Sequence, residues 1–183
     1  MNPVEPPPSA PSRQPTWRFM AEHPAHWLAL GGGSGLSPVA PGTAGTLWAW
    51  VAYLVLSRWL TPLHWGVVIA VGLPVGWWAC TVTARHLGKP DPSAVVWDEV
   101  LAFWLVLWLV MPAGLWMQLT AFALFRYFDA AKPGPVGWAD GLFKGHGPEV
   151  GWAQGFGILF DDLVAALCTL LVIAAGVALW GAR

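Results

Sequence analysis

Uncharged apolar runs long enough to cross a membrane limit the folds that this chain can adopt. An α-helix needs about 20 residues to cross the ~30 Å hydrocarbon core of a bilayer. Trp65–Ala84 has this length, with Pro74 as a point of kinking, and Leu163–Trp180 has it too. Lipid cannot pair backbone polar groups, so such runs predict helices. We therefore expect an all-α, multi-pass membrane helical bundle.

The composition agrees with lipid as the main solvent of the chain. Hydrophobic residues make up 56% of the sequence and charged residues 10%, whereas soluble domains carry about 25% charged residues. The 15 tryptophans suit a protein whose rings lie at membrane interfaces. A net charge of −1 without a basic cluster predicts no nucleic-acid partner. No obligate protein partner is evident, and the expected partner is the bilayer.

Two further apolar stretches are shorter or interrupted. Thr46–Ser57 ends at Arg58, and the uncharged stretch Val100–Phe125 is split by Met111–Gly114, with the sequence MPAG. Proline and glycine at that point favour a helix-hairpin turn, with arms of roughly Val95–Met111 and Leu115–Asp129. The alternative is one long, kinked span. With the hairpin, about four to five spans are expected.

The N-terminal residues are expected to lie outside the bundle. Residues 1–16 are rich in proline and serine. Proline breaks a helix interior, and such a composition favours disorder. We predict a disordered tail over 1–20 and a single membrane-embedded domain over 21–183. No secretory signal peptide is expected, so insertion depends on the spans themselves.

Charge placement predicts the orientation. If the hairpin is threaded, the N-terminus and the segments 31–45, 85–99 and 126–162 fall on one side of the membrane. That side collects most of the basic residues, namely Arg13, Arg18, Arg85, Lys89, Arg126, Lys132 and Lys144, and all the acidic ones. An excess of Lys and Arg marks the cytoplasmic face. We expect the charged groups to face the cytoplasm.

Three charged clusters lie at predicted span ends on this side. They are Asp98 with Glu99, then Arg126 with Asp129 and Lys132, and finally Asp161 with Asp162. Solvated helix ends stabilised by the helix dipole are one interpretation of each cluster. However, a carboxylate deep in the bilayer costs roughly 2.5 kcal/mol or more, and adjacent pairs repel each other. A shared divalent cation offsets both costs, and Mg²⁺ takes such oxygen ligands. The predicted metal ligands are Asp98, Glu99, Asp129, Asp161 and Asp162.

The Gly-rich segment 31–46 (GGGSGLSPVAPGTAGT) is a candidate phosphate site. Glycines allow the backbone N–H groups to turn inward and bind an anion. The candidates are Ser34, Gly35, Ser37, Gly42 and Thr43, together with Arg126 and Lys132. A Gly-rich interfacial turn without a ligand is the alternative. No Walker lysine follows the segment, so nucleotide binding is not predicted.

These groups together indicate hydrolysis of a phosphate ester at a membrane surface, with an anionic phospholipid as the expected substrate. A metal can neutralise the phosphate and activate water, while Arg126 and Lys132 hold phosphate oxygens. The predicted catalytic residues are Asp98, Glu99, Arg126, Asp129, Lys132, Asp161 and Asp162; His146 is a further candidate for proton transfer. A nucleophilic cysteine followed by arginine six residues later is absent, and so is Asp-x-Asp.

Four motifs resemble the phosphatidylglycerophosphatase A family of bacteria. They are GSGLSPVAPGTAGT (33–46), VWDE (96–99), FRYFDAAKPGP (125–135) and GILFDDLVAAL (157–167), and the resemblance runs from about 27 to 170. It implies an all-helical bundle of the inner membrane. It also implies Mg²⁺-dependent removal of the terminal phosphate of phosphatidylglycerophosphate, which yields phosphatidylglycerol and inorganic phosphate on the cytoplasmic side.

Two other functions remain as alternatives. The first is a non-enzymatic ion-binding transporter; transport sites usually lie near the membrane midplane, whereas these charges lie at span ends. The second is a phosphatase for another lipid phosphate, such as phosphatidic acid.

Overall fold

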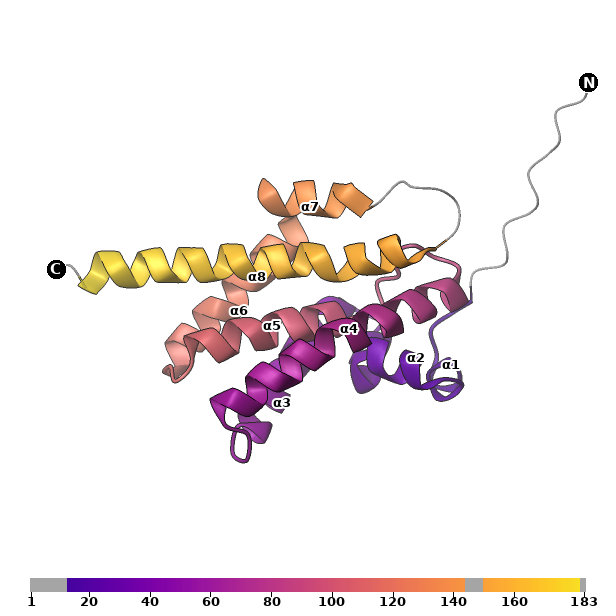
Figure 1. Cartoon of the computed structure of the whole chain (residues 1–183), viewed down its shortest axis with the longest axis horizontal. Helices are drawn as coiled ribbons and strands as arrows, with labels where there is room; N and C mark the ends of the chain where they lie inside the picture. The colour runs from indigo at the N-terminus through magenta and orange to yellow at the C-terminus, as the bar shows by residue number, and fades with distance from the viewer. Residues whose placement is uncertain (1–12, 144–149, 182–183) are drawn as a thin grey trace, which may run out of the picture.

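A computed structural model of the chain describes residues 13–143 and 150–181, and within these ranges every regular element is a helix (Figure 1). The all-α expectation is therefore confirmed for the described residues. The elements are α1 (Trp17–Ala21), α2 (Pro24–Ala29), the 3₁₀ helix η1 (Gly31–Leu36), α3 (Pro41–Leu56), α4 (Pro62–Leu87), α5 (Trp97–Val110), α6 (Leu115–Ala131), α7 (Pro135–Phe143) and α8 (Trp152–Gly181).

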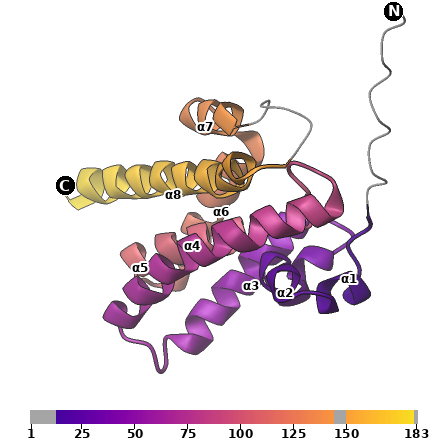
Figure 2. The ribbon, with the colours of Figure 1, turned by 45° about the vertical axis from the view of Figure 1, so that its right-hand side comes forward.

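The long helix α8 connects the two sides of the bundle. It packs against α4, α5 and α6 on one side and against α7 on the other, while α3 packs on α5 and α2 on α4. Figures 1 and 2 both show α7 separated from α3 and α4 by α8. The core between the helices is closed by large apolar side chains with at most 1% exposure, among them Trp65, Leu101, Phe103, Leu107 and Phe125.

Local sequence signals explain where α4 begins and ends. The Thr61 side chain accepts from the His64 N–H, the His64 side chain accepts from the Thr61 N–H, and Pro62 occupies the first turn. The helix ends at Gly88, whose φ of 67° lies in the left-handed region that glycine enters without steric cost. Pro74 lies inside the helix without ending it.

The predicted hairpin is confirmed, and the single long span is wrong. Helix α5 ends at Val110 and α6 begins at Leu115, with Met111–Gly114 as the turn between them. The turn brings the C-terminus of α6 back towards the N-terminus of α5, which places Asp129 on the same side of the bundle as Asp98.

Two described helices have the length and apolar character of membrane spans. They are Pro62–Leu87 and Trp152–Leu179, which contain 18-residue stretches with mean hydropathies of 1.8 and 2.4. Helices α3, α5 and α6 contain 16, 14 and 17 residues, which at ~1.5 Å per residue fall short of ~30 Å. The expected count of four to five spans is therefore not confirmed and stays a prediction.

The N-terminal boundary differs from the prediction. The sequence assigned residues 1–20 to a tail, yet Trp17–Ala21 is helical, with a Thr16 side-chain cap, and Phe19 and Met20 are buried. These two residues pack with Leu30 and Leu87, so the bundle begins before residue 20. Residues 1–12 lie outside the described residues.

A histidine cluster connects α2 to the C-terminal end of α4. His26 is 1% exposed; its Nδ1–H donates to the Phe19 carbonyl at 2.8 Å, and its Nε2 lies 2.7 Å from Nδ1 of His86. Burial lowers the pKa of His26 below 6.5, and the nearby His86 and His23 add to this effect. The cluster therefore favours a neutral His26 in the folded protein.

Candidate active site

One pocket of about 320 Å³ brings together all seven predicted catalytic residues. It lies among the N-terminus of α3, the loop before α5, the first turn of α5, the C-terminus of α6 and the N-terminal third of α8. Its charged lining residues are Asp91, Asp98, Glu99, Arg126, Asp129, Lys132, Asp161 and Asp162. The six acidic residues outnumber the two basic ones, so the pocket is strongly acidic.

Three of the carboxylates form a group suited to a metal ion. Asp98 and Glu99 lie in the first turn of α5, and Asp162 comes from α8. One oxygen of each lies within 4.8 Å of the other two. An ion that holds its oxygens at about 2 Å places opposite ligands about 4 Å apart, which is close to this spacing.

Hydrogen bonding inside the pocket tests whether a cation fits. Four carboxylate oxygens are buried without a hydrogen-bond partner: Asp98 Oδ1, Glu99 Oε2, Asp161 Oδ1 and Asp162 Oδ2. Buried charge is costly unless it is paired or binds a metal. A hard cation takes oxygen ligands, so the donor set fits Mg²⁺.

Arg126 lies beside the three-carboxylate group and is fixed by several contacts. Its Nη1 forms an ion pair with Asp129, one turn later on α6, and lies 3.9 Å from Glu99 Oε1. The same nitrogen is 3.5 Å from Thr46 Oγ1 on α3. Arg126 therefore joins α3, α5 and α6, and its planar guanidinium suits an anion with two oxygens.

Lys132 lies where α6 ends and joins two further helices. Its Nζ forms ion pairs with Asp140 of α7 and with Asp161 Oδ2 of α8, the latter at 2.5 Å. Burial alone would lower the pKa of Lys132, but hydrogen bonds to these two carboxylates raise it. Lys132 therefore stays charged at the edge of the pocket.

The contacts described above separate the five predicted metal ligands into two sets. Asp98, Glu99 and Asp162 form the three-carboxylate group, whereas Asp129 pairs with Arg126 and Asp161 pairs with Lys132. The two adjacent aspartates of the sequence thus have different neighbours, because consecutive residues on a helix point about 100° apart.

The N-terminus of α3 supplies the remaining wall through Ala40, Pro41 and Gly42. No side chain caps this 16-residue helix, and the first N–H groups of a helix have no intrahelical acceptor. Such an end attracts anions. A Cβ at Gly42 would lie 2.3 Å from Glu99 Oε1, so a larger residue here displaces the Glu99 carboxylate.

The other predicted phosphate ligands do not line the pocket. Ser34 Oγ donates to the Gly31 carbonyl at 3.0 Å, and Ser37 Oγ donates to the Val39 carbonyl at 2.8 Å. A Cβ on Gly35 would lie 2.0 Å from the Ala94 carbonyl oxygen. Thr43 lies in the first turn of α3 beyond the lining residues. A phosphate-binding role for these four residues stays a prediction.

Glycines of this segment have a different role, which sequence reasoning missed. Gly35 packs against Ala94, and a Cβ on Gly45 would lie 2.8 Å from Val96 Cβ. Both therefore let the backbone before α5 come close, and that backbone positions Asp98 and Glu99. The Val96 N–H also donates to the Ala29 carbonyl at 2.9 Å.

Sequence reasoning also missed three polar residues of the site. Asp91 and Ser93 line the pocket from the loop between α4 and α5, and Asp140 contacts Lys132 from α7. Only their proximity in sequence to the predicted charged clusters pointed to them. His146 lies outside the described residues.

Together the fold and the pocket define a class: an all-helical protein with two helices of membrane length and an acidic pocket beside a helix N-terminus. Residues 27–177 match the family model of phosphatidylglycerophosphatase A. The chain belongs to the phosphatidylglycerophosphatase A family and is a phosphatase.

Individual relatives are similar in sequence to this chain over most of its length. Phosphatidylglycerophosphatase A of Escherichia coli K12 is 36% identical over 161 residues, 87% of this chain and 84% of the relative. The Haemophilus influenzae protein of the same name is 35% identical, covering 84% and 88%. A Bacteroides thetaiotaomicron protein, provisionally named phosphatidylinositol-3-phosphatase, is 38% identical, covering 84% and 92%. No solved structure matches the chain.

Proposed function

We propose that this chain is a Mg²⁺-dependent phosphatidylglycerophosphatase of the bacterial inner membrane. It would hydrolyse the terminal phosphate of phosphatidylglycerophosphate to give phosphatidylglycerol and inorganic phosphate. The observation that carries the proposal is the set of four unpaired, buried carboxylate oxygens in one pocket with Arg126, Lys132 and the α3 N-terminus. The names of two relatives support the choice of lipid.

Asp98, Glu99 and Asp162 would hold the cation, because they form the three-carboxylate group. Bound there, Mg²⁺ would neutralise phosphate charge and lower the pKa of water. The side chains and backbone of the protein would position the phosphate and supply positive charge. The Gly42 N–H and Arg126 would bind phosphate oxygens from two sides, and Lys132 would bind a third.

The remaining carboxylates, Asp129 and Asp161, are candidates for proton transfer. Each lies in the pocket beside a basic side chain, Arg126 or Lys132, which fixes one of its oxygens. In the proposed reaction the water oxygen forms a bond to phosphorus while the ester P–O bond breaks. The proton lost by the water passes to a carboxylate, which returns it to the departing glycerol oxygen.

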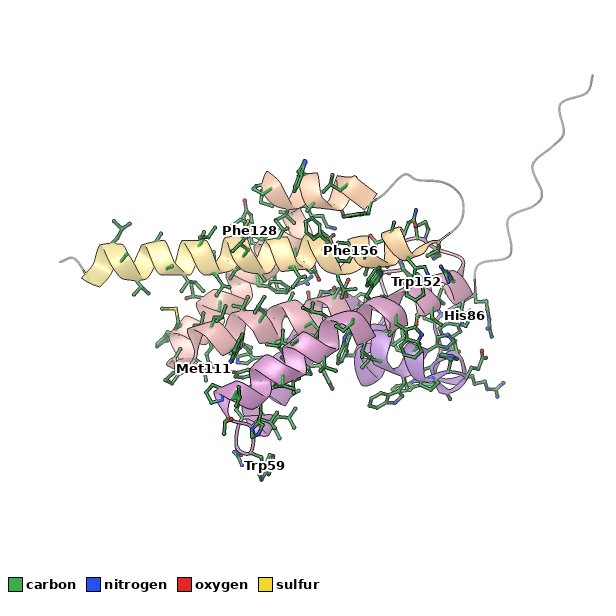
Figure 3. The ribbon with its side chains drawn as sticks, viewed as in Figure 1. Trp59, His86, Met111, Phe128, Trp152 and Phe156 are labelled. Atoms are coloured by element: carbon green, nitrogen blue, oxygen red, sulfur yellow. The ribbon has the colours of Figure 1, made fainter. Side chains whose placement is uncertain are left out.

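The surface supports insertion in a bilayer. Exposed apolar side chains lie along the middle of the helices, for example Val51, Val67, Val71 and Leu171. Exposed tryptophans lie near both ends: Trp59 is 71% exposed at the α3–α4 turn, and Trp152 is 49% exposed at the start of α8. Figure 3 shows these two rings at opposite ends of the bundle, as interfacial anchors require. We propose that the pocket end faces the cytoplasm.

Phosphate release by the purified full-length protein in detergent tests this function. We expect release from phosphatidylglycerophosphate with Mg²⁺, loss of release with a chelator, and slower release from phosphatidic acid or phosphatidylinositol 3-phosphate. A faster rate with either of the latter lipids would replace the substrate but keep the chemistry. An absence of release from all three lipids would refute the proposed function.

A further inference from the structure

The ammonium group of Lys132 is held by carboxylates from two different helices. Asp161 of α8 contacts Nζ at 2.5 Å through Oδ2, and Asp140 of α7 contacts it through Oδ1. Lys132 and Asp161 line the pocket, whereas Asp140 does not. The Lys132 side chain is 30% exposed and that of Asp140 is 21% exposed. Asp140 therefore lies just outside the pocket, in contact with the two lining residues Lys132 and Asp161.

Helix α7 is fixed closely against the end of α6, so Asp140 has a defined position. Lys132 has a φ of 45°, and this left-handed residue turns the chain into α7 within three residues. A Cβ on Gly137 would lie 2.6 Å from the Lys132 carbonyl oxygen. Val136 and Ala139, on the inner face of α7, are fully buried.

A lysine needs such support more than an arginine does. Its ammonium is a compact charge on a flexible four-carbon chain, and its position is set only by its contacts. Asp161 alone would leave Lys132 free to rotate about a single ion pair. The second carboxylate, Asp140 of α7, gives Nζ a second fixed contact at the edge of the pocket.

We propose that Asp140 is a positioning residue for the phosphate-binding lysine. It holds the Lys132 ammonium where the phosphate of the substrate binds. This inference rests on the proposed function of the pocket as a phosphate-ester hydrolase. It assigns a role in substrate binding to α7, a helix whose side chains contribute nothing to the pocket lining among the described residues.

The experiment compares Asp140→Asn, Asp140→Glu, Lys132→Met and the double variant Asp140→Asn/Lys132→Met in the full-length protein. For Asp140→Asn we expect the KM for phosphatidylglycerophosphate and the inhibition constant of inorganic phosphate to rise about tenfold, because a charged hydrogen bond is lost. We expect a smaller change in kcat. Asp140→Glu should restore part of the binding, since it keeps the carboxylate.

The double variant gives the sharpest test. If Asp140 acts through Lys132, the effects will not add, and the double variant will match Lys132→Met within about twofold. Glu22→Gln removes an exposed acidic partner of Arg13 remote from the pocket and serves as the control, with wild-type kinetics. Melting temperatures of all variants separate lost folding from lost binding.

Three outcomes would overturn the inference while leaving the proposed function intact. They are wild-type kinetics for Asp140→Asn, multiplying effects in the double variant, or a kcat loss at unchanged KM that Asp140→Glu does not rescue. The last outcome would indicate a purely structural role for Asp140. A wild-type protein that releases no phosphate would instead refute the proposed function.

Discussion

A methyl group added at Gly42 should separate activity from stability. The Cβ of Gly42→Ala would lie 2.3 Å from Glu99 Oε1 and 3.2 Å from Arg126 Nη1. Glu99 must therefore retreat by about 1 Å to reach ordinary van der Waals distance. Glu99 belongs to the three-carboxylate group, so this displacement disturbs the cation site and Arg126 together.

The expected loss follows from the size of this displacement. A misplacement of about 1 Å at a reacting centre can cost about 100-fold in rate, so we expect kcat for phosphatidylglycerophosphate to fall by about this factor. Helix propensity acts in the other direction, because alanine is up to ~1 kcal/mol more favourable than glycine inside a helix. The melting temperature should therefore change by only a few degrees.

Gly176→Ala is the matched control. Gly176 lies within α8, and a Cβ there would meet no atom within 4 Å. This variant should keep wild-type kinetics and gain slightly in melting temperature. The reasoning is refuted if Gly42→Ala, assayed in detergent with saturating Mg²⁺, turns over as fast as Gly176→Ala.

Three further predictions concern the cation, the phosphate and pH. Asp162→Asn should abolish phosphate release and the rise in melting temperature that Mg²⁺ produces in the wild type by binding the folded state; an unchanged Mg²⁺ shift in a thermal melt would contradict the cation role. Arg126→Lys loses the two-pronged contact, so KM should rise roughly tenfold in steady-state kinetics, and an unaltered KM would argue against phosphate contact. Burial lowers the pKa of His26 below 6.5, so the folded state binds this proton less tightly than the unfolded chain does. Stability is then full above pH 6.5 and declines as the pH falls below it. His26→Gln should flatten this decline between pH 7.5 and 5 in melting-temperature measurements, and an equally steep decline in the variant would exclude His26 as its source.

Local sequence patterns were sufficient for the helical class and the hairpin. The apolar runs predicted α4 and the C-terminal part of α8, and MPAG predicted the turn between α5 and α6. The tail boundary was wrong because Phe19 and Met20 are held by packing against Leu30 and Leu87, which are distant in sequence. The short helix α7 was not foreseen, since a nine-residue segment has too little periodicity to indicate its partner.

The sequence by itself determined which charged residues stand at the helix ends on one side of the bundle, because run lengths and turn residues are local properties. Only the tertiary structure decided their partners: Asp162 joins Asp98 and Glu99, whereas its neighbour Asp161 joins Lys132 and Asp140. It also decided that Gly42 leaves room for Glu99 and that Gly35 leaves room for Ala94. The physical reason is that the environment of a charge or a missing side chain depends on helices brought together by packing, and no local pattern encodes which helices those are.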